Sequence, residues 1–308
     1  MALAGQAAAI GNLPCILHAS SSLMHHSVRH VPLSVMTARL GLAGAFCLFA
    51  AMPMHAADDG PWTAVRDFAS DTWYDTGDIL TAPGAWGVVE WSALGVGVAA
   101  IGVSMVTIDK DIRNESQENR NEQGDRMAHL ANQLGTALSL GVLGISAGIG
   151  LIGGGDRPLA LARDGLEASI IASGIIVPTL KFAFGRSRPD QETDGGNDDF
   201  TPFSGNYSFP SGHTTQAFAI ASVVANTYRE HWWAGALAFG VAGTVGYARI
   251  NDNQHYLSDV IAGAMIGSFV GWSVVNLNRA RRLGADVTAS IVTSFQPEGQ
   301  SLGVRLHF

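Results

Sequence analysis

Long apolar segments dominate the chain between residues 86 and 277. They cover approximately residues 86–108, 127–153, 159–184, 211–228, 232–248 and 255–277. None of them alternates apolar and polar residues for long, and each exceeds the usual length of a strand. The pattern therefore predicts an all-α fold with about six core helices.

Two flanking segments have a different pattern. Residues 57–83 mix aromatic and acidic side chains, which predicts an amphipathic helix over the core before a loop at Ala82-Pro83-Gly84. Near the C-terminus, two β-rich stretches are joined by Pro297-Glu298-Gly299, which predicts a hairpin within residues 283–308. Because a lone hairpin is marginally stable in water, we expect it to dock on the helices or on another subunit of a homo-oligomer. The core domain then spans residues 84–282.

The first 56 residues resemble an export signal. They contain no Asp or Glu, and an apolar stretch at residues 40–51 precedes small residues at Ala56-Ala57. This pattern predicts a signal peptide with an extended leader. Both cysteines, Cys15 and Cys47, lie within it, so a processed chain would have no disulfide.

Composition leaves two cellular locations to compare. With 47% hydrophobic and 14% charged residues, and with small residues at four-residue spacing (Gly263, Gly267, Gly271), the helices could pack in a membrane. However, six spans would place Gly84 in the cytoplasm by the positive-inside rule, whereas a signal peptide would deliver residue 57 to the outside. We therefore expect a soluble or peripheral protein of the periplasm or cell envelope. A net charge of −8 excludes nucleic acid as the expected partner.

The first candidate for chemistry is the stretch from Arg249 to Asp259. His255 and Asp259 are four residues apart, so on a helix the carboxylate would orient the imidazole as a nucleophile or base. Arg249, just upstream, could hold an anion that His255 attacks. The alternative is a helix N-terminus with a surface ion pair.

Two further segments predict an anion site. Lys181 and Arg188 are seven residues apart, close to two helical turns, so both cations point the same way before Pro189 ends the helix. Together with Arg249 they suit a multivalent anion such as phosphate. Arg186 is out of phase, and we interpret it as a surface charge.

The second of these segments is Pro210-Ser211-Gly212-His213, which opens a helix. Its N–H groups could bind an anion, and His213 would then be placed to protonate a leaving oxygen. The alternative is a Ser cap with an incidental histidine. Two polar segments are interpreted as connections: residues 109–126 as a solvated one, and residues 190–198 as a lid rather than a calcium loop, because Thr201 stands where a bidentate Glu would be needed.

Together the three segments resemble the type 2 phosphatidic acid phosphatase (PAP2) superfamily, which includes class A acid phosphatases and vanadium haloperoxidases. The family pattern is Lys, six residues, Arg-Pro; Pro-Ser-Gly-His; and Ser-Arg, five residues, His, three residues, Asp. This chain departs from it only at Ala248, which replaces the serine. The resemblance implies a PAP2-like helical bundle and the following roles: His255 as nucleophile, Asp259 as its orienting carboxylate, His213 as proton donor, and Lys181, Arg188, Ser211, Gly212 and Arg249 as phosphate ligands.

The resemblance also implies a reaction without a metal or cofactor. We expect an enzyme that hydrolyses phosphate monoesters or diphosphate esters through a phosphohistidine, and the apolar helices favour lipid phosphates as substrates. A vanadate-dependent haloperoxidase is the alternative among enzymes. A non-catalytic envelope protein that binds lipid is the alternative from another class.

Overall fold

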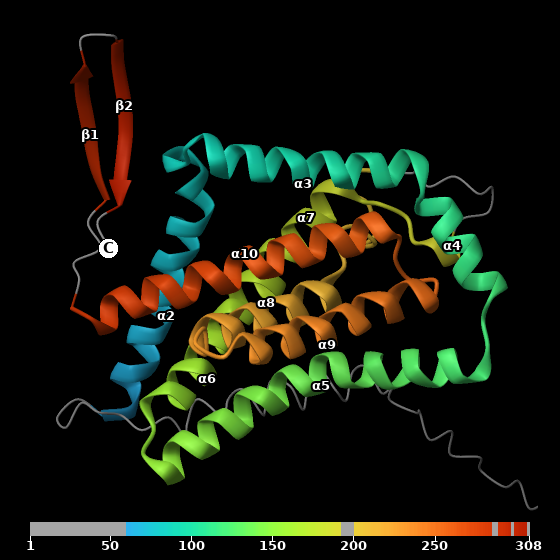
Figure 1. Cartoon of the computed structure of the whole chain (residues 1–308), viewed down its shortest axis with the longest axis horizontal. Coiled ribbons are helices and arrows are strands. Elements are labelled where there is room, and N and C mark those ends of the chain that lie inside the picture. Colours follow the sequence, from blue (N-terminus) through green and yellow to red (C-terminus); the bar gives the residue numbers. More distant parts are fainter. Residues whose placement is uncertain (1–59, 192–199, 285–288, 297–298, 307–308) are drawn as a thin grey trace, which may run out of the picture.

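Helices make up almost all of the described chain, as the apolar pattern predicts (Figure 1). The computed structural model describes residues 60–191, 200–284, 289–296 and 299–306. The predicted signal peptide, both cysteines and most of the predicted lid therefore lie outside the described residues. The α-helices are α2 (Gly60–Thr81), α3 (Val88–Thr107), α4 (Asp109–Glu118), α5 (Glu122–Gly153), α6 (Asp156–Ser169), α7 (Val177–Phe184), α8 (Gly212–Thr227), α9 (Trp232–Asn251) and α10 (Leu257–Arg282).

The third apolar segment forms one continuous helical rod with a local change of winding. Between α6 and α7 the backbone is π-helical over η2 (Ile170–Ile176), and the Val177 N–H donates to the Ala172 carbonyl, five residues back. Pro178 follows immediately and has no N–H to continue an α-helical ladder. The rod therefore carries an extra residue in this turn, as at other π-bulges.

The centre of the bundle is α8, which packs most extensively against α10 and α9. The small residues predicted to allow close packing lie at the contact with α10. A Cβ on Gly267 would lie 2.3 Å from the Thr215 carbonyl oxygen, and one on Gly271 would lie 2.5 Å from that of Ala219. The two backbones are therefore in direct contact, which places the N-termini of α8 and α10 side by side at one end of the bundle.

The predicted amphipathic segment forms α2 and the 3₁₀ turn η1 (Ala82–Ala85). Phe68 and Ile79 are buried at helical spacing, whereas Trp62 and Trp73 are exposed. On the buried face, Arg281 of α10 donates to Asp75. An amphipathic helix thus covers the end of the bundle opposite to the N-termini of α8 and α10 (Figure 1).

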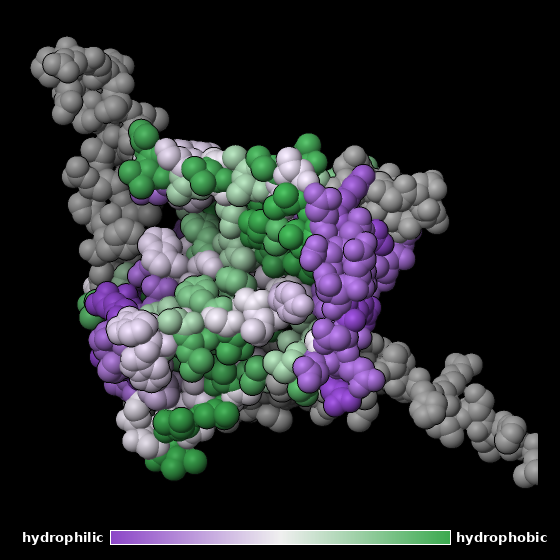
Figure 2. Space-filling view, turned by 45° about the vertical axis from the view of Figure 1, so that its right-hand side comes forward, coloured by the Kyte–Doolittle hydropathy of each residue, from purple (hydrophilic) through white to green (hydrophobic). Residues whose placement is uncertain are grey.

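The expectation of a soluble or peripheral protein is wrong. Three helical stretches, Val88–Thr107, Asp156–Phe184 and Leu257–Arg282, are long and apolar enough to cross a membrane. In the first of them only 6% of the apolar window is buried inside the protein. Figure 2 shows hydrophobic and neutral residues over much of one face, with a hydrophilic band at the α4 side.

These observations identify an integral membrane protein, because a helix that is apolar on all sides and uncovered by protein needs lipid around it. The opposite prediction failed because it gave the conflict between a signal peptide and six spans more weight than the length and apolarity of the individual segments. The sequence alone does not show which apolar side chains pack on one another and which point outward.

After α10, the strands β1 (Ala289–Gln296) and β2 (Gly299–Leu306) pair in antiparallel register. Ala289 lies opposite Leu306, and Gln296 lies opposite Gly299. Docking of this hairpin on the helices or on a second subunit stays a prediction.

Candidate active site

The three segments singled out in the sequence meet at one end of the bundle. The Ser211 N–H, at the start of α8, donates to the Asp259 carbonyl at the start of α10 over 3.0 Å. The His255 N–H donates to the Arg249 carbonyl in the last turn of α9 over 3.2 Å. Lys181 reaches the same place from α7, since its Nζ donates to the Ser208 carbonyl over 3.2 Å.

His255 lies just before α10 rather than on it, because Tyr256 is the N-cap of that helix. Asp259 is the third residue of α10, and its Oδ2 accepts the Tyr256 N–H at 3.0 Å. The same oxygen lies 3.4 Å from His255 Nδ1, a long hydrogen bond, and accepts the Ser208 hydroxyl at 2.6 Å. The carboxylate thus faces Nδ1, which leaves Nε2 for the pocket.

The His255 ring is almost completely buried, with 3% of its surface exposed. Burial, together with repulsion from Lys181 and Arg249, lowers the pKa of His255 to about 4, although Asp259 opposes this shift. His255 is therefore neutral at neutral pH. A neutral, oriented imidazole is the form that can act as a nucleophile.

The cations come from three different elements. Lys181 also donates to the Tyr207 carbonyl, and its Cε would lie 3.9 Å from a Cβ on Gly212. Arg188, just after α7, donates to the Gln254 side chain next to His255. Arg249 is mostly buried, 3.9 Å from Asp252. Lys181, Arg188 and Arg249 thus bring positive charge close to the two histidines, and such a group of cations suits a phosphate.

His213 completes the group from the first turn of α8. Its ring is accessible from solvent, yet desolvation by the surrounding protein and the nearby charges of Arg249, His255, Lys181 and Arg188 lower its pKa to about 4. The influence of these neighbours on His213 indicates that the two histidines and three cations lie near one another. Ser211 is buried at the N-cap of α8, where its hydroxyl accepts from Thr214 at 2.9 Å.

Arg186 is not a surface charge, and this interpretation is corrected. Only 1% of the residue is exposed, and its guanidinium donates to Asp259 Oδ1 at 2.6 Å and to Asp109 Oδ2 at 3.0 Å. Asp109 is also buried, and it accepts from Ser104 and from the Ser258 N–H. One feature of the sequence could have indicated a buried role for Asp109: it directly follows the apolar segment 86–108.

The segment interpreted as a solvated connection contains α4, which contacts the loop between α9 and α10. Arg113 donates to the Asn253 side chain and to the Pro189 carbonyl, each at 2.9 Å. Gln117 donates to the Asn251 carbonyl at 3.2 Å. These contacts hold the loop between α9 and α10 in which His255 lies. Sequence reasoning missed them because the partners are 76 to 140 positions apart.

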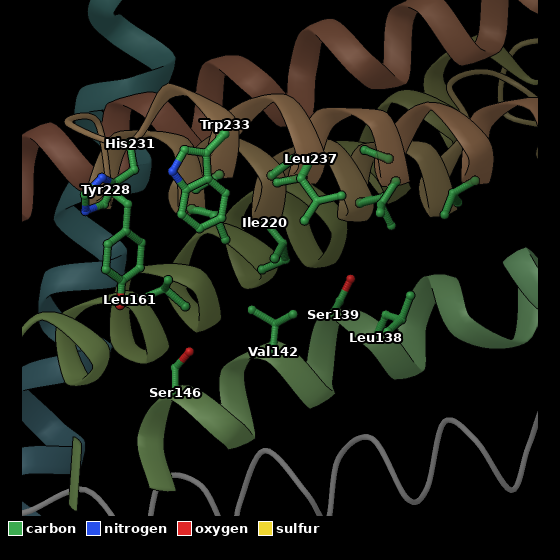
Figure 3. A pocket seen from close by; sticks show the side chains of 18 residues that line it. Leu138, Ser139, Val142, Ser146, Leu161, Ile220, Tyr228, His231, Trp233 and Leu237 are labelled. Atoms are coloured by element: carbon green, nitrogen blue, oxygen red, sulfur yellow. The ribbon is translucent and has the colours of Figure 1, made fainter. Parts of the chain in front are cut away.

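An apolar groove of about 540 Å³ lies elsewhere, between α5 and the pair α8 and α9 (Figure 3). Val142, Ile220 and Leu237 line it, with Tyr228 and Trp233 at one end. None of the predicted catalytic residues contributes to it. Among the residues with described side chains, no group of three or more His, Cys, Asp or Glu could hold a metal ion.

Several known proteins are similar to the part of this chain that contains the site. Residues 165–283 match the model of the PAP2 superfamily. A lipid A 1-phosphatase of Rhizobium etli is 40% identical over 113 residues, which cover 35% of this chain and 45% of that protein. A lipid A 1-phosphatase of Porphyromonas gingivalis is 36% identical over 113 residues, which cover 36% and 22% of the two chains. The chain thus spans less than half the length of these curated relatives.

Two solved structures are also similar. The structure of Aquifex aeolicus LpxE has a TM-score of 0.43 and 24% sequence identity, and the match covers 55% of this chain and 96% of that chain. The structure of a transmembrane PAP2 type phosphatidylglycerolphosphate phosphatase from Bacillus subtilis has a TM-score of 0.42 and 17% sequence identity, and the match covers 69% of this chain and 94% of that chain. The family match over residues 165–283 contains all three motif segments. In residues 165–283 the chain is therefore similar to the PAP2 superfamily, as the motifs predicted.

Proposed function

We propose that this protein hydrolyses phosphate esters, with membrane lipid phosphates as its substrate class, through a phosphohistidine at His255. One observation carries the proposal: a buried, neutral imidazole backed by Asp259 lies close to the charges of Lys181, Arg188 and Arg249. A nucleophile beside three cations suits an anionic ester and its phosphoryl-transfer transition state.

In the first step, Nε2 of His255 attacks phosphorus. Its Nδ1 keeps a proton directed at Asp259, so the carboxylate stabilises the positive charge that develops on the ring. The three cations and the Gly212 N–H stabilise the equatorial oxygens, where negative charge accumulates. The bond between phosphorus and the leaving oxygen breaks as the bond to nitrogen forms.

His213 supplies the proton for the leaving oxygen. In the free site the cations keep its pKa low, at about 4. A bound phosphate ester offsets their charge, so the pKa of His213 rises when substrate enters and the ring can hold a proton. After the alcohol leaves, the same imidazole accepts a proton from the water that cleaves the phosphohistidine.

The surroundings of the site favour a lipid. Phe182 and Phe184 follow Lys181 on α7 and are exposed, as are Phe203 and Tyr207 in the next loop. The rings of Phe182 and Phe203 make an edge contact at 5.3 Å. Exposed aromatic side chains at the end of a spanning helix suit the boundary between membrane and water, where a lipid headgroup lies. The names of the lipid A phosphatase relatives support the same substrate class.

The proposal is tested with the full chain purified in detergent. Phosphate release is measured from lipid A, phosphatidic acid and p-nitrophenyl phosphate, for the wild type, His255→Ala and His129→Ala. His129 is an exposed histidine of α5, so its variant serves as the matched control. We expect activity in the wild type and the control and none in His255→Ala. Equal rates in all three proteins would refute the catalytic role, and vanadate-dependent bromide oxidation would favour the haloperoxidase alternative.

A further inference from the structure

A buried chain of charges runs from α4 to the candidate nucleophile. Asp109 accepts from Arg186, Arg186 donates to Asp259, and Asp259 faces Nδ1 of His255. We propose that Arg186 and Asp109 are positioning residues that hold Asp259, and through it the imidazole, in the reactive orientation. This inference rests on the proposed function of His255. Asp109 lies outside the three motif segments, and Arg186 lies within the first of them but is not one of its matched family positions.

The guanidinium of Arg186 is held in one orientation. Its Nη1 donates to Asp259 at 2.6 Å and to the Ser258 hydroxyl at 2.7 Å, while Nη2 donates to Asp109 at 3.0 Å. Its Cζ also lies over two rings, 4.3 Å from the centroid of Tyr256 and 5.3 Å from that of Phe200. Lysine could not replace this fork, because a single ammonium cannot bridge two carboxylates and stack on two rings.

The backbone around Arg186 is built to hold it there. Gly185 ends α7 in the left-handed region with φ of 58°, and a Cβ at this position would lie 1.8 Å from the Thr201 carbonyl oxygen. Arg186 then forms an isolated antiparallel bridge with Phe200. The chain therefore turns inward at Gly185 and directs the arginine towards Asp259.

The charge balance of Asp109, Arg186 and Asp259 explains why two carboxylates flank one arginine. Asp259 is fully buried and needs a cation, yet a neutral pair of Arg186 and Asp259 would have little attraction left for an imidazolium. Asp109 shares the guanidinium, so the group of three keeps a net negative charge next to His255. That charge favours the positively charged ring formed during phosphoryl transfer.

This series of charged residues also links the proposed nucleophile to the membrane-spanning helix α3. Ser104, in the last turn of α3, donates to Asp109 at 2.8 Å, and Asp109 accepts the Ser258 N–H at 2.9 Å. The end of α3 is thereby fixed to the first turn of α10, two residues from the catalytic loop. The position of α3 therefore contributes to the orientation of Asp259.

The test is a double-mutant cycle on the full chain in detergent, with Arg186→Met and Asp259→Asn measured alone and together. We expect Arg186→Met to lower kcat at least about 10-fold while the inhibition constant of inorganic phosphate changes by less than about twofold, since the phosphate ligands remain. In the Asp259→Asn background the same change should cost less than about threefold, because the carboxylate that Arg186 positions has gone.

Arg282→Met is the matched control, since Arg282 pairs with the buried Asp164 at the other end of α10. It should lower the melting temperature and leave kcat unchanged. If Arg186→Met does not fold, Arg186→Lys and Asp109→Asn carry the same cycle, with kcat losses of at least about threefold. Full kcat in these variants, or equal losses in both backgrounds, overturns the inference alone. A wild type that is inactive on every phosphate ester overturns the proposed function as well.

Discussion

Replacement of Asp259 by asparagine tests how much the carboxylate contributes to the reaction. The substitution keeps the shape of the side chain but removes its charge. In the wild type, the two carboxylate oxygens accept from Arg186, Ser208 and the Tyr256 N–H, and one of them also faces His255. An amide has one oxygen for these donors, and its NH₂ group would face at least one of them. The imidazole therefore loses both its orientation and the stabilisation of its positive charge.

The size of the effect follows from the geometry. A unit charge 3.4 Å from the ring nitrogen is worth about 5 kcal/mol at an effective dielectric constant of about 20. Since about 1.4 kcal/mol corresponds to a factor of ten in rate, the complete loss of this interaction would lower kcat about 3,000-fold. Part of the geometry survives in the amide, so we expect a decrease of between about 10²-fold and 10³-fold, with KM changed little.

The assay is single-turnover phosphate release from a phosphate monoester by the full chain in detergent. Asp164→Asn is the matched control, because Asp164 is an equally buried carboxylate that pairs with Arg282 far from the site. It should affect thermal stability and leave kcat as in the wild type. A decrease of less than tenfold in Asp259→Asn, or equal decreases in both variants, would refute the electrostatic reasoning.

Three further predictions concern pH, packing and metal. Because the pKa of His255 is lowered to about 4, kcat/KM should fall only as the pH drops through that value. The unfolded chain binds this proton below about pH 6.5, so His255 should also decrease the free energy of unfolding by up to about 3 kcal/mol between pH 6.5 and pH 4. His255→Ala should remove this contribution and leave that of His213, whose pKa is also lowered to about 4. A pH dependence of the melting temperature that the substitution does not change would contradict the prediction. Gly267→Val should lower the melting temperature strongly, because its Cβ would lie 2.3 Å from the Thr215 carbonyl oxygen. Gly148→Val is the control, because the space around Gly148 is open. Equal melting temperatures of the two variants would count against the close packing of α8 and α10. EDTA should leave the hydrolysis rate intact, and a loss that an added metal restores would disprove a metal-independent reaction.

The sequence alone determined the helices and the motif residues, because both depend on short-range spacing. Apolar segments of helical length predicted the all-α fold. The prediction that Lys181 and Arg188, seven positions apart, lie on one helix that Pro189 ends is wrong, because α7 ends at Phe184 and Gly185 turns the chain before Arg188. Glycines at four-residue intervals predicted a close helix contact, which the structure shows between α10 and α8. The spacing of His255 and Asp259 brought them together even though His255 lies outside the helix.

Only the tertiary structure decided which charges are buried and which apolar surfaces face outward. Arg186 has its carboxylate partners 73 and 77 positions away, and Asp109 reaches Ser258 across 149 positions, so no local pattern reveals them. The outward apolar faces of α3 likewise depend on what the rest of the chain leaves uncovered. Burial is a property of the neighbours that a side chain acquires in the fold, whereas periodicity belongs to the segment itself.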